Sequence, residues 1–272
     1  MNSIDALFTR LRTERKKAFI PFLTAGDPNL ETSAALIEEA ARRGASLIEI
    51  GFPYSDPIAD GSVIQASYTR ALDKGVKIDG IFDMIRGLSA KEPFRSGQTP
   101  LAGMVSYSLV FHRGPEAFLK QAKEAGLAGL IVPDLPLEES VPLSEIARKL
   151  DFKLIQLVTP TTPRDRAEKI AATSTGFLYC VSVVGITGAR VELPPELLDQ
   201  LHWLRTKTSL PLCVGFGISK PEHVHMLKPA ADGVIVGSHL VRRLENPNKL
   251  ATADLVRQIG DEIQSLATAL NG

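Results

Sequence analysis

The chain has 272 residues, of which 44% are apolar, and it carries 31 basic and 31 acidic side chains. The resulting zero net charge gives no support to a nucleic-acid-binding or membrane-surface protein, and no apolar run reaches the roughly 20 residues that cross a bilayer. The N-terminal residues lack the basic start and apolar block of a signal peptide. Because both cysteines, Cys180 and Cys213, lie in apolar runs, we expect buried thiols and a cytoplasmic location.

The spacing of apolar residues predicts helices that alternate with strands along the chain. A helix over 3–15 is followed by a strand over 18–25, and then by a helix with Asp27 as N-cap and Pro28 as its first residue. That helix ends near Arg43, and the strand that carries Glu49 comes next. Further strands are expected over 101–105, 128–132, 153–158, 176–181, 210–214 and 234–236, and further helices over 62–73, 79–90, 138–149, 163–173, 194–206 and 247–270, the last with Asn246 as cap and Pro247 first. A helix followed by a strand also fits 117–133 and, more weakly, 223–236.

About eight such alternations predict a parallel sheet covered by helices. Eight units in this length suit a (β/α)8 TIM barrel with an extra N-terminal helix, formed by residues 1–272 as a single domain. A doubly wound open sheet is the alternative fold. The most linker-like segment, 90–100, is interpreted as a surface loop.

One acidic residue interrupts the apolar strand that precedes Phe52. Side chains alternate between the two faces of a strand, so Leu47, Glu49 and Gly51 share one face. If the opposite face packs under helices, Glu49 points into the barrel, where a carboxylate is costly unless it has a use. Desolvation would raise its pKa and suit it to proton transfer. The proline-restricted loop that follows can place Asp60 opposite Glu49, where we expect a solvated and ionised carboxylate; Asp56 competes with Asp60 for this role.

Glycine-rich turns follow the last three predicted strands. They are 185–188, 215–219 and 237–238. In barrels the loops after the seventh and eighth strands commonly bind phosphate through backbone amides. Each turn alone could simply end a strand, but together they predict a phosphate site. The glycine spacing at 215–217 does not match a dinucleotide-binding fingerprint.

The histidines give no support to a metal site. His223 and His225 lie on a predicted helix away from the barrel mouth, and the other histidines lack Cys or carboxylate partners at ligand spacing. We therefore expect no metal.

Several segments resemble the tryptophan synthase alpha family. The longest runs from Leu47 to Gln65 and includes Glu-Ile-Gly-Phe-Pro-Tyr-Ser-Asp-Pro-Ile-Ala-Asp-Gly. Shorter matches lie at 18–28, 132–139, 185–190, 215–219 and 236–238, in the order of the family.

This resemblance implies a (β/α)8 barrel that cleaves indole-3-glycerol phosphate to indole and glyceraldehyde 3-phosphate without metal or cofactor. By the same resemblance, Glu49 is the acid–base group and Asp60 offsets charge at the indole N–H. A beta subunit is the implied partner, in an α2β2 heterotetramer that makes tryptophan. The other implied positions are Phe22, Met104, Ile131, Leu157 and Phe216 in the indole pocket, Tyr179 and Thr187 as positioning residues, Gly188, Gly217, Gly237 and Ser238 at the phosphate, and Asp56, Pro57 and Asp134 facing the partner.

The sequence departs from the family pattern at Ser106, where the family usually has a Tyr beside the substrate. Tyr107 is adjacent, but neighbouring strand residues face opposite ways. Val183 and Val184 also make their loop less polar than expected.

The alternative functions are a free-standing lyase of the same chemistry, a non-catalytic barrel that binds a phosphorylated ligand or activates a partner, and another barrel enzyme such as a sugar-phosphate isomerase or a two-carboxylate glycosidase.

Overall fold

The computed structural model describes residues 1–182, 195–215, 217–246 and 251–272. Within these residues the strands pair in parallel in the order β5-β4-β3-β2-β1-β9-β8-β7-β6. They are β1 (Ala18–Thr24), β2 (Ile48–Gly51), β3 (Leu101–Met104), β4 (Leu127–Ile131), β5 (Lys153–Ile155), β6 (Leu157–Val158), β7 (Leu178–Val181), β8 (Leu212–Gly215) and β9 (Gly233–Val236).

The two strands at the ends of this order are consecutive pieces of one extended segment. Only Gln156 separates β5 from β6, and its carbonyl accepts a hydrogen bond of 3.1 Å from the Tyr179 amide. Since β5 pairs with β4 while β6 pairs with β7, this segment closes the sheet. The predicted strand over 153–158 is therefore this pair, and the predicted barrel is confirmed over the open-sheet alternative.

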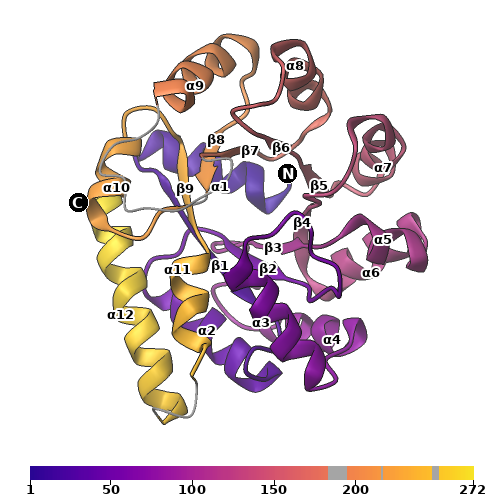
Figure 1. The fold of residues 1–272 in the computed structure, drawn as a ribbon, viewed down its shortest axis with the longest axis vertical. Helices are drawn as coiled ribbons and strands as arrows, with labels where there is room; N and C mark the ends of the chain where they lie inside the picture. The colour runs from indigo at the N-terminus through magenta and orange to yellow at the C-terminus, as the bar shows by residue number, and fades with distance from the viewer. Residues whose placement is uncertain (183–194, 216, 247–250) are drawn as a thin grey trace.

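Helices surround the strands on all sides (Figure 1). The helix α12 lies beside α2 and α10, so the C-terminal segment packs against the beginning of the barrel. The helices are α1 (Ser3–Thr13), α2 (Leu30–Arg42), α3 (Ser62–Asp73), α4 (Ile78–Ser89), α5 (Tyr107–Arg113), α6 (Pro115–Ala125), α7 (Leu137–Lys149), α8 (Arg164–Thr173), α9 (Pro195–Lys207), α10 (Pro221–Leu227), α11 (Ser238–Val241), the 3-10 helix η1 (Arg242–Leu244) and α12 (Thr252–Asn271). No helix among those described combines the length and the apolar character that crossing a bilayer requires.

Two predicted helix starts were wrong. The N-cap of α2 is Asn29, whose side chain accepts a hydrogen bond from the Thr32 amide, because the Asp27 carboxylate is occupied by α3. The helix α12 begins at Thr252 rather than at 247, and its N-cap is Ala251. The predicted first residue of this helix, Pro247, lies outside the described residues.

Apolar side chains form two clusters, one on each side of the barrel wall. The outer cluster lies between the strands and the surrounding helices, and the inner cluster fills the barrel. Four residues of α1 join the inner cluster: Ile4, Leu7, Phe8 and Leu11. The Phe8 ring lies 5.8 Å from that of Phe177, just before β7.

The entry into α1 also binds the barrel through hydrogen bonds. The Asn2 side chain donates hydrogen bonds of 2.9 Å to the carbonyls of Ala128 and Asp151, near the starts of β4 and β5. This helix therefore closes the amino end of the barrel and leaves the carboxyl end for the site.

Candidate active site

Glu49 lies inside the barrel, as strand alternation predicts. Its neighbours Ile48 and Ile50 belong to the outer cluster, whereas Glu49 is paired in register with Phe22 of β1 and Ala102 of β3, both of the inner cluster. The side chain is fully buried, and neither carboxyl oxygen has a hydrogen-bond partner among the described residues. Burial holds the pKa of Glu49 well above its ordinary value, which favours the neutral, protonated form of the side chain.

An unpartnered buried carboxyl group needs an explanation, because such groups in folded proteins are nearly always hydrogen-bonded. A buried carboxyl group inside a largely apolar barrel is therefore a candidate for proton transfer to a ligand that enters there.

Asp60 lies at the barrel mouth, on the loop between β2 and α3. The Asp60 amide donates to the Pro57 carbonyl at 3.0 Å, and the Gln65 side chain of α3 donates to the carbonyls of Asp60 and Pro57 at 2.8 and 3.2 Å. These bonds fold the loop back over α3. The N-cap of α3 is Gly61, so the carboxylate of Asp60 is not used as a helix cap.

Asp60 is half-buried rather than fully solvated, so the expectation of a solvated carboxylate holds only in part. Burial, and to a lesser extent the negative charge of Asp134, raise the pKa of Asp60 to about 6. The two carboxylates line the same cavity of about 20 Å³. The remaining lining residues are Tyr54, Asp56, Pro57, Ile58, Ala59, Tyr68, Met104, Val105, Ser106 and Pro133.

The structure brings together most of the predicted apolar pocket. Phe22, Met104, Ile131 and Tyr179 all belong to the inner cluster, and Leu157 packs against it half-buried. Met104 is paired in register with Ile131, and Leu157 with Tyr179, so these pairs come from neighbouring strands. Two further predicted positions, Thr187 and Phe216, lie outside the described residues.

Two glycines on the inner face make room for the aromatic rings. A Cβ on Gly51 would lie 2.4 Å from the Phe22 ring, and a Cβ on Gly215 would lie 2.3 Å from the Tyr179 hydroxyl oxygen. Distances this short are not tolerated, so a side chain at either position would force the aromatic ring to move.

Three of the four predicted phosphate positions, Gly217, Gly237 and Ser238, follow the neighbouring strands β8 and β9; the fourth, Gly188, lies outside the described residues. A Cβ on Gly237 would lie 3.4 Å from the Phe22 Cβ, which places this glycine beside the apolar pocket. Gly217 has φ of +76° with open space around it, a conformation that favours glycine. Both loops therefore lie at the carboxyl end of the barrel, near the Phe22 side of the site.

The residues predicted to face a partner lie on two loops at the same end. Asp56 is exposed and Pro57 half-buried, and the adjacent Ile58 side chain is 88% exposed. Asp134, after β4, accepts hydrogen bonds of 2.6 Å from the Ser106 hydroxyl and 2.8 Å from the Tyr107 amide.

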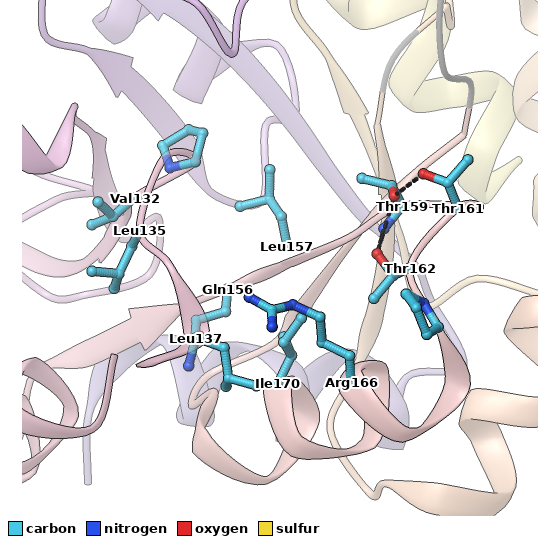
Figure 2. Close-up of a pocket in the computed structure, with 12 residues that line it drawn as sticks. Val132, Leu135, Leu137, Gln156, Leu157, Thr159, Thr161, Thr162, Arg166 and Ile170 are labelled. Carbon is cyan, nitrogen blue, oxygen red and sulfur yellow. Dashed lines mark hydrogen bonds between the residues drawn. The ribbon is translucent and has the colours of Figure 1, made fainter. Parts of the chain in front are cut away.

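A larger pocket of about 300 Å³ lies beside the barrel mouth, between the loop after β4 and the start of α8. Figure 2 shows Arg166 extending from α8 into this pocket toward Gln156 and Leu157, while the hydrogen-bonded hydroxyls of Thr159, Thr161 and Thr162 lie on the other side of the view. Arg166 is bound by Glu138 through hydrogen bonds of 2.7 and 3.1 Å. Neither Glu49 nor Asp60 lines this pocket, so its size does not make it the catalytic centre.

No group of three or more His, Cys, Asp or Glu side chains within the described ranges could hold a metal ion. His239, which follows β9, instead contacts Glu262 of α12 at 3.1 Å.

The chain matches the model of one known protein family. A model of the tryptophan synthase alpha chain matches residues 8–270. The chain belongs to this family. It is 49% identical to the tryptophan synthase alpha chain of Rhodopirellula baltica, over 100% of this chain and 99% of that one, and 41% identical to that of Caldanaerobacter subterraneus, over 99% and 100%.

Solved structures of the family have the same fold. Tryptophan synthase subunit alpha from Legionella pneumophila superposes with a TM-score of 0.87 at 33% identity, covering 99% of this chain and 98% of that one. A chain of the tryptophan synthase complex from Pyrococcus furiosus superposes with a TM-score of 0.82 at 34% identity, covering 93% and 99%.

One residue of the site was missed from the sequence. Tyr68 of α3 belongs to the inner cluster and lines the cavity that holds Asp60 and Asp134. Its spacing from Ile64 is that of an ordinary buried helix face, so the pattern alone gave no reason to separate it from the core.

Proposed function

We propose that this chain cleaves indole-3-glycerol phosphate to indole and glyceraldehyde 3-phosphate, with Glu49 as the proton donor and acceptor. Membership of the tryptophan synthase alpha family supports the reaction, which that family performs as a carbon–carbon lyase. The observation that carries the residue assignment is the fully buried and unpartnered carboxyl group of Glu49.

The chemistry accounts for a neutral acid at this position. Indole leaves as a carbanion equivalent, and it becomes a good leaving group only when its C3 atom is protonated. Glu49 gives its proton to C3, and the carbon–carbon bond then breaks as the hydroxyl on the adjacent glycerol carbon loses its proton. The Glu49 carboxylate takes up that proton, so the acid is restored as the aldehyde forms.

Asp60 has the complementary role in the proposal. Protonation of C3 places positive charge on the ring nitrogen, and a fixed carboxylate at the indole N–H stabilises that charge. A pKa of about 6 leaves Asp60 mostly ionised at neutral pH, while burial keeps its interactions strong. The two carboxyl groups thus differ in protonation, as acid–base pairs in active sites commonly do.

The remaining predicted positions complete the site. Phe22, Met104, Ile131 and Leu157 supply the apolar walls for the indole ring, and Tyr179 is the positioning residue at their side. Backbone amides around Gly217, Gly237 and Ser238 bind the phosphate of the glycerol chain. We extend the same proposal to the positions outside the described residues, namely Thr187, Gly188 and Phe216.

A beta subunit is the partner of the chain, as in the solved tryptophan synthase complexes of the family. We propose that Asp56, Pro57 and Asp134 face this subunit, because they lie on the loops at the open end of the barrel, beside the exposed Ile58. Released indole would then pass directly to the partner within an α2β2 assembly. Two free, buried cysteines support a cytoplasmic location.

The test is indole release from indole-3-glycerol phosphate by the purified chain, alone and with a beta subunit. We expect slow release alone and faster release in the complex. We expect Glu49→Gln to lower the rate at least about a hundredfold, with an unchanged circular dichroism spectrum. The matched control is Glu145→Gln, at an exposed position on α7.

Absence of indole release by the wild-type chain in both arms would refute the reaction. Full activity of Glu49→Gln would refute the role of Glu49 alone. Equal rates with and without the beta subunit would favour the free-standing lyase.

A further inference from the structure

The family resemblance described above leads us to expect a tyrosine beside the substrate at one position where this chain has none. That position is Ser106, whose hydroxyl donates a 2.6 Å hydrogen bond to Asp134. The neighbouring Tyr107 does not replace it, because its ring packs against the outer cluster and lies 6.1 Å from the ring of exposed Phe111. The wall of the site near Asp134 therefore has no phenol from β3 or its loop.

Tyr68 brings a phenol to this wall from a different element. It extends from α3 into the barrel, is 3% exposed, and lines the same cavity as Ser106, Asp60 and Asp134. Its hydroxyl oxygen lies 3.0 Å from the position that a Cβ on Gly51 would take. The hydroxyl is therefore held at the end of β2, the strand that carries Glu49.

The part of α3 that bears Tyr68 is firmly anchored. Ser67 and Arg70 both donate hydrogen bonds to Asp27, a fully buried carboxylate after β1, at distances of 2.5 to 3.1 Å. One turn earlier, Gln65 binds the carbonyl of Asp60. The same helix thus fixes both the phenol and the loop that carries Asp60, so their relative positions are defined before a ligand arrives.

The charges around Tyr68 suit a hydrogen-bond donor. Burial raises the pKa of Tyr68 well above its ordinary value, and the negative charge of Asp60 raises it further. The phenol therefore keeps its proton across the working range of the protein. Toward an ionised carboxylate, a protonated phenol acts only as a donor.

We propose that Tyr68 is a positioning residue of the lyase reaction, supplying from α3 the phenol that relatives usually carry at position 106. With substrate bound, its hydroxyl donates to the carboxylate of Asp60 and holds that carboxylate in line with the indole N–H. This inference rests on the proposed function, since it assigns Tyr68 a part in the charge stabilisation given there to Asp60.

The first test is Tyr68→Phe, which keeps the ring and removes only the hydroxyl. We expect kcat for indole release to fall about three- to tenfold, the effect of one lost hydrogen bond, with a much smaller change in KM. The melting temperature should stay close to that of the wild type. Tyr107→Phe is the matched control and should leave kcat unchanged, because its ring packs outside the barrel.

The second test moves the phenol. Tyr68→Ser alone should lower kcat further than Tyr68→Phe, since the ring is lost as well. Adding Ser106→Tyr to Tyr68→Ser should restore most of the lost kcat, because the phenol then enters the same cavity from its usual position. A purely structural role for Tyr68 predicts no such rescue.

Unchanged kcat in Tyr68→Phe would overturn the inference, and so would a double variant no more active than Tyr68→Ser alone. A wild-type chain without indole release would remove the proposed function and this inference with it. That case is recognised separately, because wild type, Glu49→Gln and Tyr68→Phe would then be indistinguishable.

Discussion

Glu49 is paired in register with Phe22 across β1 and β2, and the ring of Phe22 occupies the space left open by Gly51, two residues beyond Glu49. The acid therefore has an aromatic neighbour on the wall of the barrel rather than a polar partner. This pairing keeps the Glu49 carboxyl neutral and leaves a flat apolar surface beside it, which suits a planar aromatic substrate.

The buried acid predicts how stability depends on pH. The native state holds the proton of Glu49 to a higher pH than the unfolded chain, where the carboxyl titrates near its ordinary value of 4.5. The free energy of unfolding of the wild type should therefore fall, relative to that of Glu49→Gln, as the pH rises above that value. Urea unfolding of both proteins between about pH 5 and pH 8 measures the difference. A difference that does not change with pH would contradict the raised pKa.

Asp60 and Asp134 together predict the acidic limb of the activity profile. Since the pKa of Asp60 is about 6, kcat/KM should decline below that pH, as the carboxylate becomes protonated and no longer offsets charge on the indole ring. Asp134→Asn removes a charge that raises this pKa, so the limb should move to lower pH. The variant amide can still accept the hydrogen bond from Tyr107. An acidic limb that stays at the same pH or moves to higher pH would show that the charge of Asp134 does not raise the pKa of Asp60.

The late glycine loops predict competition by inorganic phosphate. Phosphate should inhibit indole release competitively with the substrate, and Gly217→Ala should raise its inhibition constant about five- to tenfold, because a positive φ disfavours any residue with a Cβ. Gly87→Ala is the control, since this glycine lies in α4 with open space around it. Inhibition that is not competitive, or an unchanged constant in Gly217→Ala, would count against a phosphate site at these loops.

The anchor of α3 predicts a contrast between two ion pairs. Asp27 is fully buried and bound by Arg70 at 2.6 Å, so Asp27→Ala should lower the free energy of unfolding by roughly 2–4 kcal/mol. Asp83 forms an exposed pair with Arg86 within α4, and Asp83→Ala should produce no measurable change. Chemical denaturation of both variants at neutral pH tests this, and similar values for the two would show that α3 is not anchored by Asp27.

The sequence predicted the fold and the position of Glu49 because both depend on local periodicity. The helix predicted over 62–73 has the same bounds as α3, and the alternation around Glu49 placed it inside the barrel. Those patterns need no knowledge of distant contacts. The assignment of Glu49 as the acid–base group remains a prediction for the indole assay.

The features that sequence reasoning missed depend on long-range contacts. Asp27 was predicted as an N-cap from local preference, but its carboxylate binds Arg70, 43 positions away. Asp60 was expected to be solvated, but its loop folds over α3 and leaves it half-buried in a cavity that Asp134 also lines. In the sequence, Tyr68 has the spacing of an ordinary buried helix residue. Only the folded barrel brings its hydroxyl close to three carboxyl groups.

The helix α1 has a consequence for the route that indole takes. Its buried side chains close the amino end of the barrel, namely Ile4, Leu7, Phe8 and Leu11. The Asn2 side chain binds this helix to carbonyls near the starts of β4 and β5. In the proposed reaction, indole formed beside Glu49 cannot leave through the closed amino end of the barrel. We therefore expect it to leave at the carboxyl end, past the loops on which Asp56 and Asp134 lie. The first helix of the chain is thus expected to direct product release toward the end of the barrel where we propose that the beta subunit binds.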